Sequence, residues 1–191
     1  VLLILASQSP RRRRLLRQVG YRVRVVPSGI EEPVDPDHSP AQHVRKVALD
    51  KALHVAQRVR GGIVVAADTE VILRGRIFGK PASAADARRM LATLSGKTHV
   101  VHTGVALVNA RNGRRRTFVE STRVTFRRLS RAEISSYVAS GAPMDKAGAY
   151  GIQDDHGAVF VERIEGCFYT VMGFPLSRFH RELKLFLRRQ H

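Results

Sequence analysis

The stretch "LLILASQSPRRRRLLRQVGYRVRVV", residues 2–26, decides the fold because its local pattern changes from strand to helix and back. An apolar, strand-like run at 2–6 is followed by Ser9-Pro10, and a second apolar run lies at 23–26. Serine as N-cap with proline in the first helical position is a common helix start. The alternation predicts an α/β domain, and a junction from strand to helix is a common place to hold phosphate.

The rest of the chain repeats these patterns. The remaining strand candidates are apolar and partly β-branched, and they lie at 63–67, 100–108 and 159–164. Ser39-Pro40 predicts the start of a longer helix, and Ser130 opens a third helix with a capping box. Asn112-Gly113, between two strand-like runs, predicts a hairpin. We therefore expect a mixed, elongated, twisted sheet flanked by helices, in a single domain over residues 1–191.

Composition limits the class of protein. A chain of 191 residues that is 43% hydrophobic can bury a sizeable core. No apolar run approaches the roughly 18 residues that span a bilayer, so we expect a cytoplasmic protein with no membrane partner. Cys167 is the single cysteine, which excludes an intramolecular disulfide and a cysteine-rich zinc site.

The formal charge is +17, from 33 Lys and Arg against 16 Asp and Glu. A basic field raises the local concentration of any polyanion, whether DNA, RNA or a free nucleotide. The arginines are scattered through the whole chain, whereas dedicated nucleic-acid binders usually gather their charge on one face. Nucleic acid is therefore a candidate partner but not the expected main one.

Helical periodicity places two cations on apolar stripes. Arg12 shares a stripe with Leu15 and Leu16, whereas Arg13 and Arg14 point elsewhere. In the next predicted helix, Lys51 falls inside the buried stripe. A buried cation needs a partner. Alternatively, the aliphatic part of either side chain could pack along the edge of the core while its charged end stays in water. Two such cations on separate helices favour an anion site.

Candidate acidic groups follow the buried run at 63–67. Asp68 and Thr69 would lie at the carboxyl end of a strand, where open α/β sheets bind ligands, although Asp68 could merely cap a turn. Lys80 is on a loop before a proline, and the loop "GIEE" at 29–32 adds carboxylates suited to Mg²⁺. The histidines have no metal-ligand spacing, and we interpret them as structural or exposed. These groups suit phosphate chemistry without a covalent nucleophile.

Five segments resemble, in order and spacing, the motifs of the Maf family of nucleoside triphosphate pyrophosphatases. They are "LILASQSPRRRRLL", "AADTEVILRGRIFGKP", "MLATLSGKTHVVHTGVAL", "DKAGAYGIQ" and "VERIEGCFYTVMGFPL". The resemblance extends over essentially the whole chain, from residue 3 to about residue 179. The resemblance implies a fold of the inosine-triphosphate-pyrophosphatase type, with two lobes around a central cleft. It also implies hydrolysis between the α and β phosphates with a divalent cation, Mg²⁺ or Mn²⁺, and a tendency to form homodimers.

The segments "ADT" at 67–69 and "DKAGAYGIQ" at 145–153 look like the form that acts on dTTP, UTP and modified nucleotides such as 5-methyl-UTP, clearing the nucleotide pool. The resemblance makes Asp68 the catalytic base, with Glu32 and Asp68 at the metal. It implies that the remaining positions bind substrate. Those that read the base would be Arg11, Thr69 and Gln153. Those that line the phosphates would be Ser7, Arg12, Lys51, Lys80 and Lys146. The alternative function is that of a nucleic-acid-binding or septum-formation-regulating protein that acts by binding.

Overall fold

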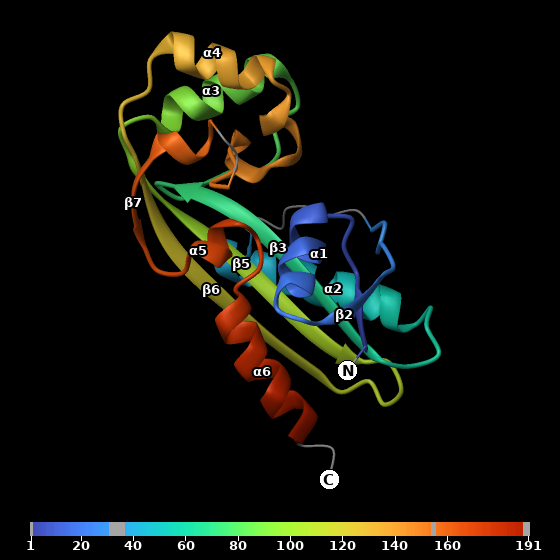
Figure 1. The fold of residues 1–191 in the computed structure, drawn as a ribbon. Coiled ribbons are helices and arrows are strands. Elements are labelled where there is room, and N and C mark those ends of the chain that lie inside the picture. Colours follow the sequence, from blue (N-terminus) through green and yellow to red (C-terminus); the bar gives the residue numbers. More distant parts are fainter. Residues whose placement is uncertain (1, 31–36, 154–155, 189–191) are drawn as a thin grey trace. The chain divides into compact units, whose positions relative to one another are not determined.

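The computed structural model describes residues 2–30, 37–153 and 156–188 (Figure 1). Contacts divide the chain into two compact units. The first unit comprises residues 1–68, 103–120 and 173–191, and the second comprises 69–102 and 121–172. The single domain and the cleft between two lobes stay predictions. Within the described residues, no helix is both long and apolar enough to cross a bilayer.

The strands form one mixed sheet, which confirms the expected fold class. In chain order they are β1 (Leu2–Leu5), β2 (Arg22–Val25), β3 (Ile63–Leu73), β4 (Arg76–Phe78), β5 (Thr98–Asn109), β6 (Arg115–Phe126) and β7 (Val161–Glu165). Their spatial order is β2-β1-β3-β5-β6-β7, with β4 paired to β3. β1 runs parallel to both β2 and β3, whereas β4 and β7 pair antiparallel with their neighbours.

Two helices of the first unit, α1 (Pro10–Gln18) and α2 (Pro40–Ala56), begin where the sequence predicts, and a third, α6 (Leu176–Arg188), follows near the end of the chain. The Ser9 hydroxyl accepts a hydrogen bond from the backbone of α1, and Ser39 forms a full capping box at the start of α2. Figure 1 shows α1 and α6 on the near side of this part of the sheet and α2 behind it.

A core of small side chains holds α2 against the parallel strands. The buried residues in it come from β1, α2, β3 and β5 and include Ile4, Ala48, Ala52, Val55, Val64, Ala66 and Ala106. Alanine dominates this cluster, so the backbones of helix and sheet can approach closely. Close approach brings the functional side chains of α2 to the sheet surface.

The second unit has its own core. Its helices are α3 (Ala84–Leu94), α4 (Arg131–Ala139) and α5 (Phe168–Val171), together with short 3₁₀ turns at Ala142–Asp145, Ala147–Ala149 and Ala158–Phe160. The predicted capping box of Ser130 is present, and Ile134, Tyr137 and Val138 are buried below it. Phe126 lies among the buried aromatic rings of this core.

Two sequence predictions were wrong in detail. The strand expected to end before Asp68 continues to Leu73, because Val71, Ile72 and Leu73 pair with β4 across a tight turn. The last expected strand starts later than predicted, since its first residues form the 3₁₀ turn Ala158–Phe160. The hairpin at Asn112-Gly113 is confirmed and joins β5 to β6.

Candidate functional site

Lys51 on α2 and Asp68 on β3 form a buried ion pair within the first unit. The Lys51 Nζ donates a hydrogen bond of 2.8 Å to the Asp68 Oδ1. Their side chains are only 8% and 11% exposed, respectively. Lys51 therefore lies inward, as its helical position predicts, and its partner is the carboxylate that the sequence nominates. Asp68 lies inside a strand, so the interpretation of a turn cap is wrong.

A glycine allows α2 to lie close enough for this pair. A Cβ at Gly104 of β5 would lie 2.3 Å from the carbonyl oxygen of Val44 on α2. Any other residue here would push the helix away from the sheet, because such a contact is far below van der Waals distance. The Lys51–Asp68 pair depends on this spacing, since its two members come from the helix and from the sheet.

The parallel pairing of β1 and β3 puts Ser7 and Asp68 at one edge of the sheet. The pairing runs to Leu5 and Val65, and the Ala6 amide still donates to the Val65 carbonyl at 2.8 Å. Beyond that point the chain of β1 leaves the sheet while β3 continues. Asp68 thus lies just past the carboxyl end of the parallel region, where α/β sheets bind ligands.

Arg12 ties the start of α1 to the segment before α6. Its Nε donates to the Gly173 carbonyl at 2.9 Å, and its Nη1 donates to the Ser7 hydroxyl at 3.2 Å. The same hydroxyl accepts a hydrogen bond from the Ser9 amide. These contacts hold a guanidinium and the positive end of a helix together, an arrangement that favours a phosphate group. Arg11 is half-buried next to it.

Two ligand-type side chains near Asp68 were missed by the sequence reasoning. His43 on α2 and Glu70 on β3 are buried, and each offers a ligand atom within 4.8 Å of one on Asp68. Glu70 could have been found from the sequence. Residues two apart on a strand point to the same face of the sheet, so Glu70 lies on the same face as Asp68. His43 lies two turns before Lys51 on α2. The helical periodicity that places Lys51 on the buried face of this helix therefore places His43 there too.

The carboxylates fit a hard divalent cation. Asp68 and Glu70 supply oxygen atoms, which Mg²⁺ prefers, and they are close enough to share one ion. One oxygen of Asp68 is engaged by Lys51, and its Oδ2 has no hydrogen-bond partner among the described residues. Glu32, the other predicted ligand, lies outside the described residues.

In the second unit, the loop that carries Lys80 is joined to the segment that carries Lys146. The Gly148 amide donates to the Gly79 carbonyl at 3.0 Å. Gly148 has a φ of 68°, and a Cβ there would lie 2.9 Å from a methyl of Val71, so only glycine fits. The two predicted phosphate-binding lysines therefore belong to adjacent loops.

The two lysines differ in environment. Lys146 is buried, and its Nζ donates to the Asp145 carboxylate at 2.8 Å and to the Ala142 carbonyl. Lys80 is exposed and has no ion-pair partner among the described residues. Thr69 and Gln153, the remaining predicted positions, are half-buried in the same unit.

Comparison with known proteins finds relatives over nearly the whole chain. A family model described as Maf-like protein matches residues 2–186. The chain is 48% identical over 184 residues to a dTTP/UTP pyrophosphatase of Bacillus cereus (strain AH820), covering 96% of this chain and 95% of that protein. It is 49% identical over 183 residues to a dTTP/UTP pyrophosphatase of Bacillus cytotoxicus, covering 96% and 94%. Among solved structures, the Ham1 protein of Staphylococcus aureus matches with a TM-score of 0.45 and 14% identity, over 66% of this chain and 72% of that one.

Proposed function

This chain belongs to the Maf-like protein family, and on that premise we propose that it hydrolyses pyrimidine nucleoside triphosphates, chiefly dTTP and UTP. The support is the identity of 48–49% to proteins named dTTP/UTP pyrophosphatase, together with the motifs at 67–69 and 145–153. In the proposed reaction, water attacks the α phosphorus and the bond from that phosphorus to the bridging oxygen breaks. The products are a nucleoside monophosphate and pyrophosphate.

The observation that carries the proposal is the buried Lys51–Asp68 pair. Lys51 holds the Asp68 side chain in one orientation on the sheet, since the hydrogen bond between them is buried. Lys51 bonds the Oδ1 of Asp68, which leaves the Oδ2 to accept the proton of the attacking water. General-base help of this kind is worth about 10²- to 10⁴-fold in rate.

Glu32, Asp68 and Glu70 are the proposed holders of a divalent cation, Mg²⁺ or Mn²⁺. The donor set fits, since two of these carboxylates are buried and adjacent on β3. When bound, such a cation would offset charge on the triphosphate and on the departing pyrophosphate. The contribution of the chain is to keep both carboxylates in place on a paired strand.

The cationic side chains are proposed to bind the triphosphate of the substrate. Ser7 and Arg12 lie together at the start of α1, where a hydroxyl, a guanidinium and backbone amides converge. Lys80 and Lys146, on their joined loops, would neutralise charge on the leaving group. Charge-assisted hydrogen bonds to phosphate are about twice as strong as neutral ones, so each loss should raise the KM or lower the kcat.

Arg11, Thr69 and Gln153 are the proposed readers of the base. The amide of Gln153 carries both a donor and an acceptor, which match the N3–H and carbonyl edge of uracil or thymine. A purine presents a different edge and a larger ring. We therefore expect discrimination against GTP and ITP to rest on this position, and Gln153→Glu should reduce the preference for UTP over GTP.

The test is release of pyrophosphate and monophosphate from UTP, dTTP, 5-methyl-UTP, CTP, GTP, 7-methyl-GTP and ITP, with Mg²⁺ or Mn²⁺. Wild type is compared with Asp68→Asn and with Asp50→Asn, which changes a half-exposed aspartate of α2 that pairs with Lys46 at the protein surface. The proposal expects turnover of the uridine and thymidine nucleotides, lost in Asp68→Asn and kept in Asp50→Asn. No turnover of any nucleotide by the wild type would overturn it.

A further inference from the structure

His43 adds a nitrogen donor to the carboxylates of the proposed cation site. His43, Asp68 and Glu70 are all buried, and each offers one ligand atom that lies within 4.8 Å of those of the other two. Ligand atoms on opposite sides of one ion would be roughly 4.2 Å apart, since metal–ligand bonds are about 2.1 Å long. Small side-chain movements would therefore let all three atoms reach a single ion.

The backbone holds His43 where α2 lies close to the sheet. Its amide donates to the Ser39 carbonyl at 2.9 Å, in the first turn of the helix. The next residue, Val44, is the one whose carbonyl a Cβ at Gly104 would meet. His43 is thus part of a fixed helical turn that packs directly on the strands.

Two atoms of this cluster are buried without a hydrogen bond in the part of the chain that the structure describes. They are the Nδ1 of His43 and the Oε2 of Glu70, and each side chain makes other contacts. Buried polar atoms in proteins are nearly always bonded, and metal coordination satisfies such an atom as a hydrogen bond does. An imidazole nitrogen and a carboxylate oxygen are both common metal ligands.

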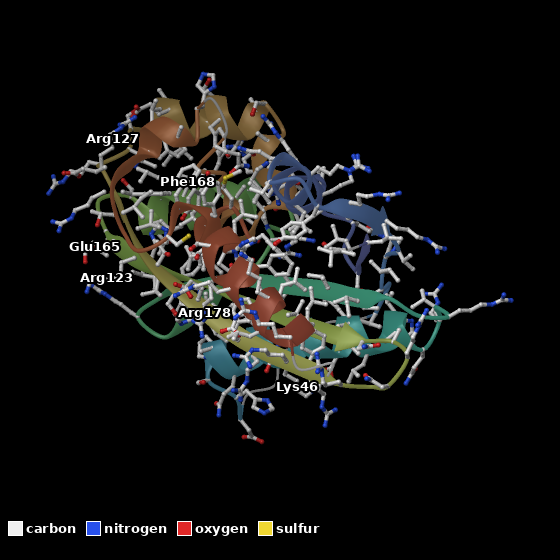
Figure 2. The ribbon with its side chains drawn as sticks, turned by 60° about the horizontal axis from the view of Figure 1, so that its bottom comes forward. Lys46, Arg123, Arg127, Glu165, Phe168 and Arg178 are labelled. Carbon is white, nitrogen blue, oxygen red and sulfur yellow. The ribbon has the colours of Figure 1, made fainter. Side chains whose placement is uncertain are left out.

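His99 and Glu165 show the different surroundings of a core histidine and of a surface carboxylate. The Nε2 of His99, which is also buried, lies 2.8 Å from the Tyr150 hydroxyl, and its ring packs on aromatic side chains. Glu165, labelled in Figure 2, is exposed and has its Oε2 3.7 Å from the Arg123 Nε. Among the described residues, only the cluster of His43, Asp68 and Glu70 brings a buried imidazole together with buried carboxylates.

We propose that His43 is a ligand of the divalent cation and makes the site select a transition-metal ion such as Mn²⁺ over Mg²⁺. The inference rests on the proposed function, which places the cation at Asp68 and Glu70. Imidazole nitrogen suits transition-metal ions, whereas Mg²⁺ prefers oxygen ligands. Mg²⁺ can still bind through the carboxylates, so His43 sets the preference between the two ions.

The experiment measures metal binding to the full chain without nucleotide. Mn²⁺ is titrated into metal-free protein and followed by electron paramagnetic resonance, and Mg²⁺ binding is measured by calorimetry. His43→Gln is the test variant, and His54→Gln is the matched control, since His54 lies on the same helix but is exposed. Electron spin-echo envelope modulation of the bound Mn²⁺ shows whether an imidazole nitrogen is coordinated.

We expect nitrogen modulation from a histidine in the wild type and in His54→Gln, and none in His43→Gln. His43→Gln should weaken Mn²⁺ binding by at least about tenfold, because even groups that only support a metal ligand contribute 10- to 100-fold. Mg²⁺ affinity should stay nearly unchanged, since the carboxylates that bind this ion are intact.

Absence of nitrogen modulation in the wild type would overturn the proposal, and this result does not depend on the folding of any variant. Equal losses of Mn²⁺ and Mg²⁺ affinity in His43→Gln, with a circular dichroism spectrum like that of the wild type, would also overturn it. The proposed function fails separately. Mn²⁺ bound through His43 in a protein that hydrolyses no nucleotide would contradict the hydrolase and leave His43 as a metal ligand.

Discussion

The Lys51 Nζ lies 2.8 Å from the Asp68 Oδ1, and both side chains are buried within one unit of the protein. The pair joins a helix to a strand, so it contributes to stability and to the proposed chemistry together. Two charges removed from water are tolerated only while each has the other. Substitutions at either position should therefore separate the structural role from the catalytic one.

Lys51→Met should lower the free energy of unfolding by about 3–5 kcal/mol, because it leaves the Asp68 carboxylate buried without its cation. The double variant Lys51→Met/Asp68→Asn should recover much of that loss, since no charge then remains. Neither variant should turn over dTTP. Urea denaturation at neutral pH measures the difference, and equal stability of the single and double variants would contradict the interpretation.

Arg12→Lys should raise the KM for dTTP by about tenfold. The substitution keeps the charge but loses the planar fork that bonds both the Gly173 carbonyl and the Ser7 hydroxyl. Arg13→Lys is the matched control, since Arg13 is the next residue of α1 and is exposed. Steady-state kinetics distinguish the two, and a similar change in KM for both variants would show that the contacts of Arg12 do not matter.

Glu70→Gln should raise the Mg²⁺ concentration for half-maximal activity by roughly 10- to 100-fold, the range found when a metal site loses a supporting group. Glu70 is buried two residues beyond Asp68, whereas Glu162 on β7 is exposed and its substitution Glu162→Gln serves as the control. Mn²⁺ binding followed by electron paramagnetic resonance gives a readout separate from turnover. Unchanged Mn²⁺ affinity in Glu70→Gln would remove this residue from the metal site.

Gly104→Ala should lower the free energy of unfolding by about 1–3 kcal/mol, the usual cost of overpacking a core. The added Cβ would meet the Val44 carbonyl at 2.3 Å, so α2 must shift away from β5. Gly79→Ala is the control, because a Cβ there meets nothing within 4 Å. If thermal denaturation gave the same midpoint for both variants, α2 would not be held as closely as the structure shows.

Local patterns predicted much of this protein, and tertiary pairing supplied the rest. The Ser-Pro helix starts and the inward position of Lys51 depend only on residues within a few turns, so the sequence was sufficient. The extension of β3 past Asp68 depends on its pairing with β4, and no local sequence pattern indicates that pairing. The joining of the Lys80 and Lys146 loops likewise depends on a hydrogen bond between residues 69 positions apart, 148 − 79.

The stability of the second unit should depend on pH through His99. This side chain is 1% exposed, its Nε2 lies 2.8 Å from the Tyr150 hydroxyl, and it packs edge-on against Phe126. Burial lowers the pKa of His99 from 6.5 to about 4, so the folded protein keeps it neutral. The unfolded chain binds more protons between these two values, and the free energy of unfolding therefore falls as the pH drops from 6.5 toward 4.

The size of the effect follows from the separation of the two pKa values of His99, which corresponds to about 3 kcal/mol between neutral pH and pH 4. His99→Gln removes the titration while keeping an amide that can bond Tyr150. Urea denaturation of wild type and variant at several pH values isolates the contribution. A flatter pH dependence in the variant is the expected result. Parallel curves would instead show that His99 has the same pKa in the folded and unfolded states, which would contradict the prediction.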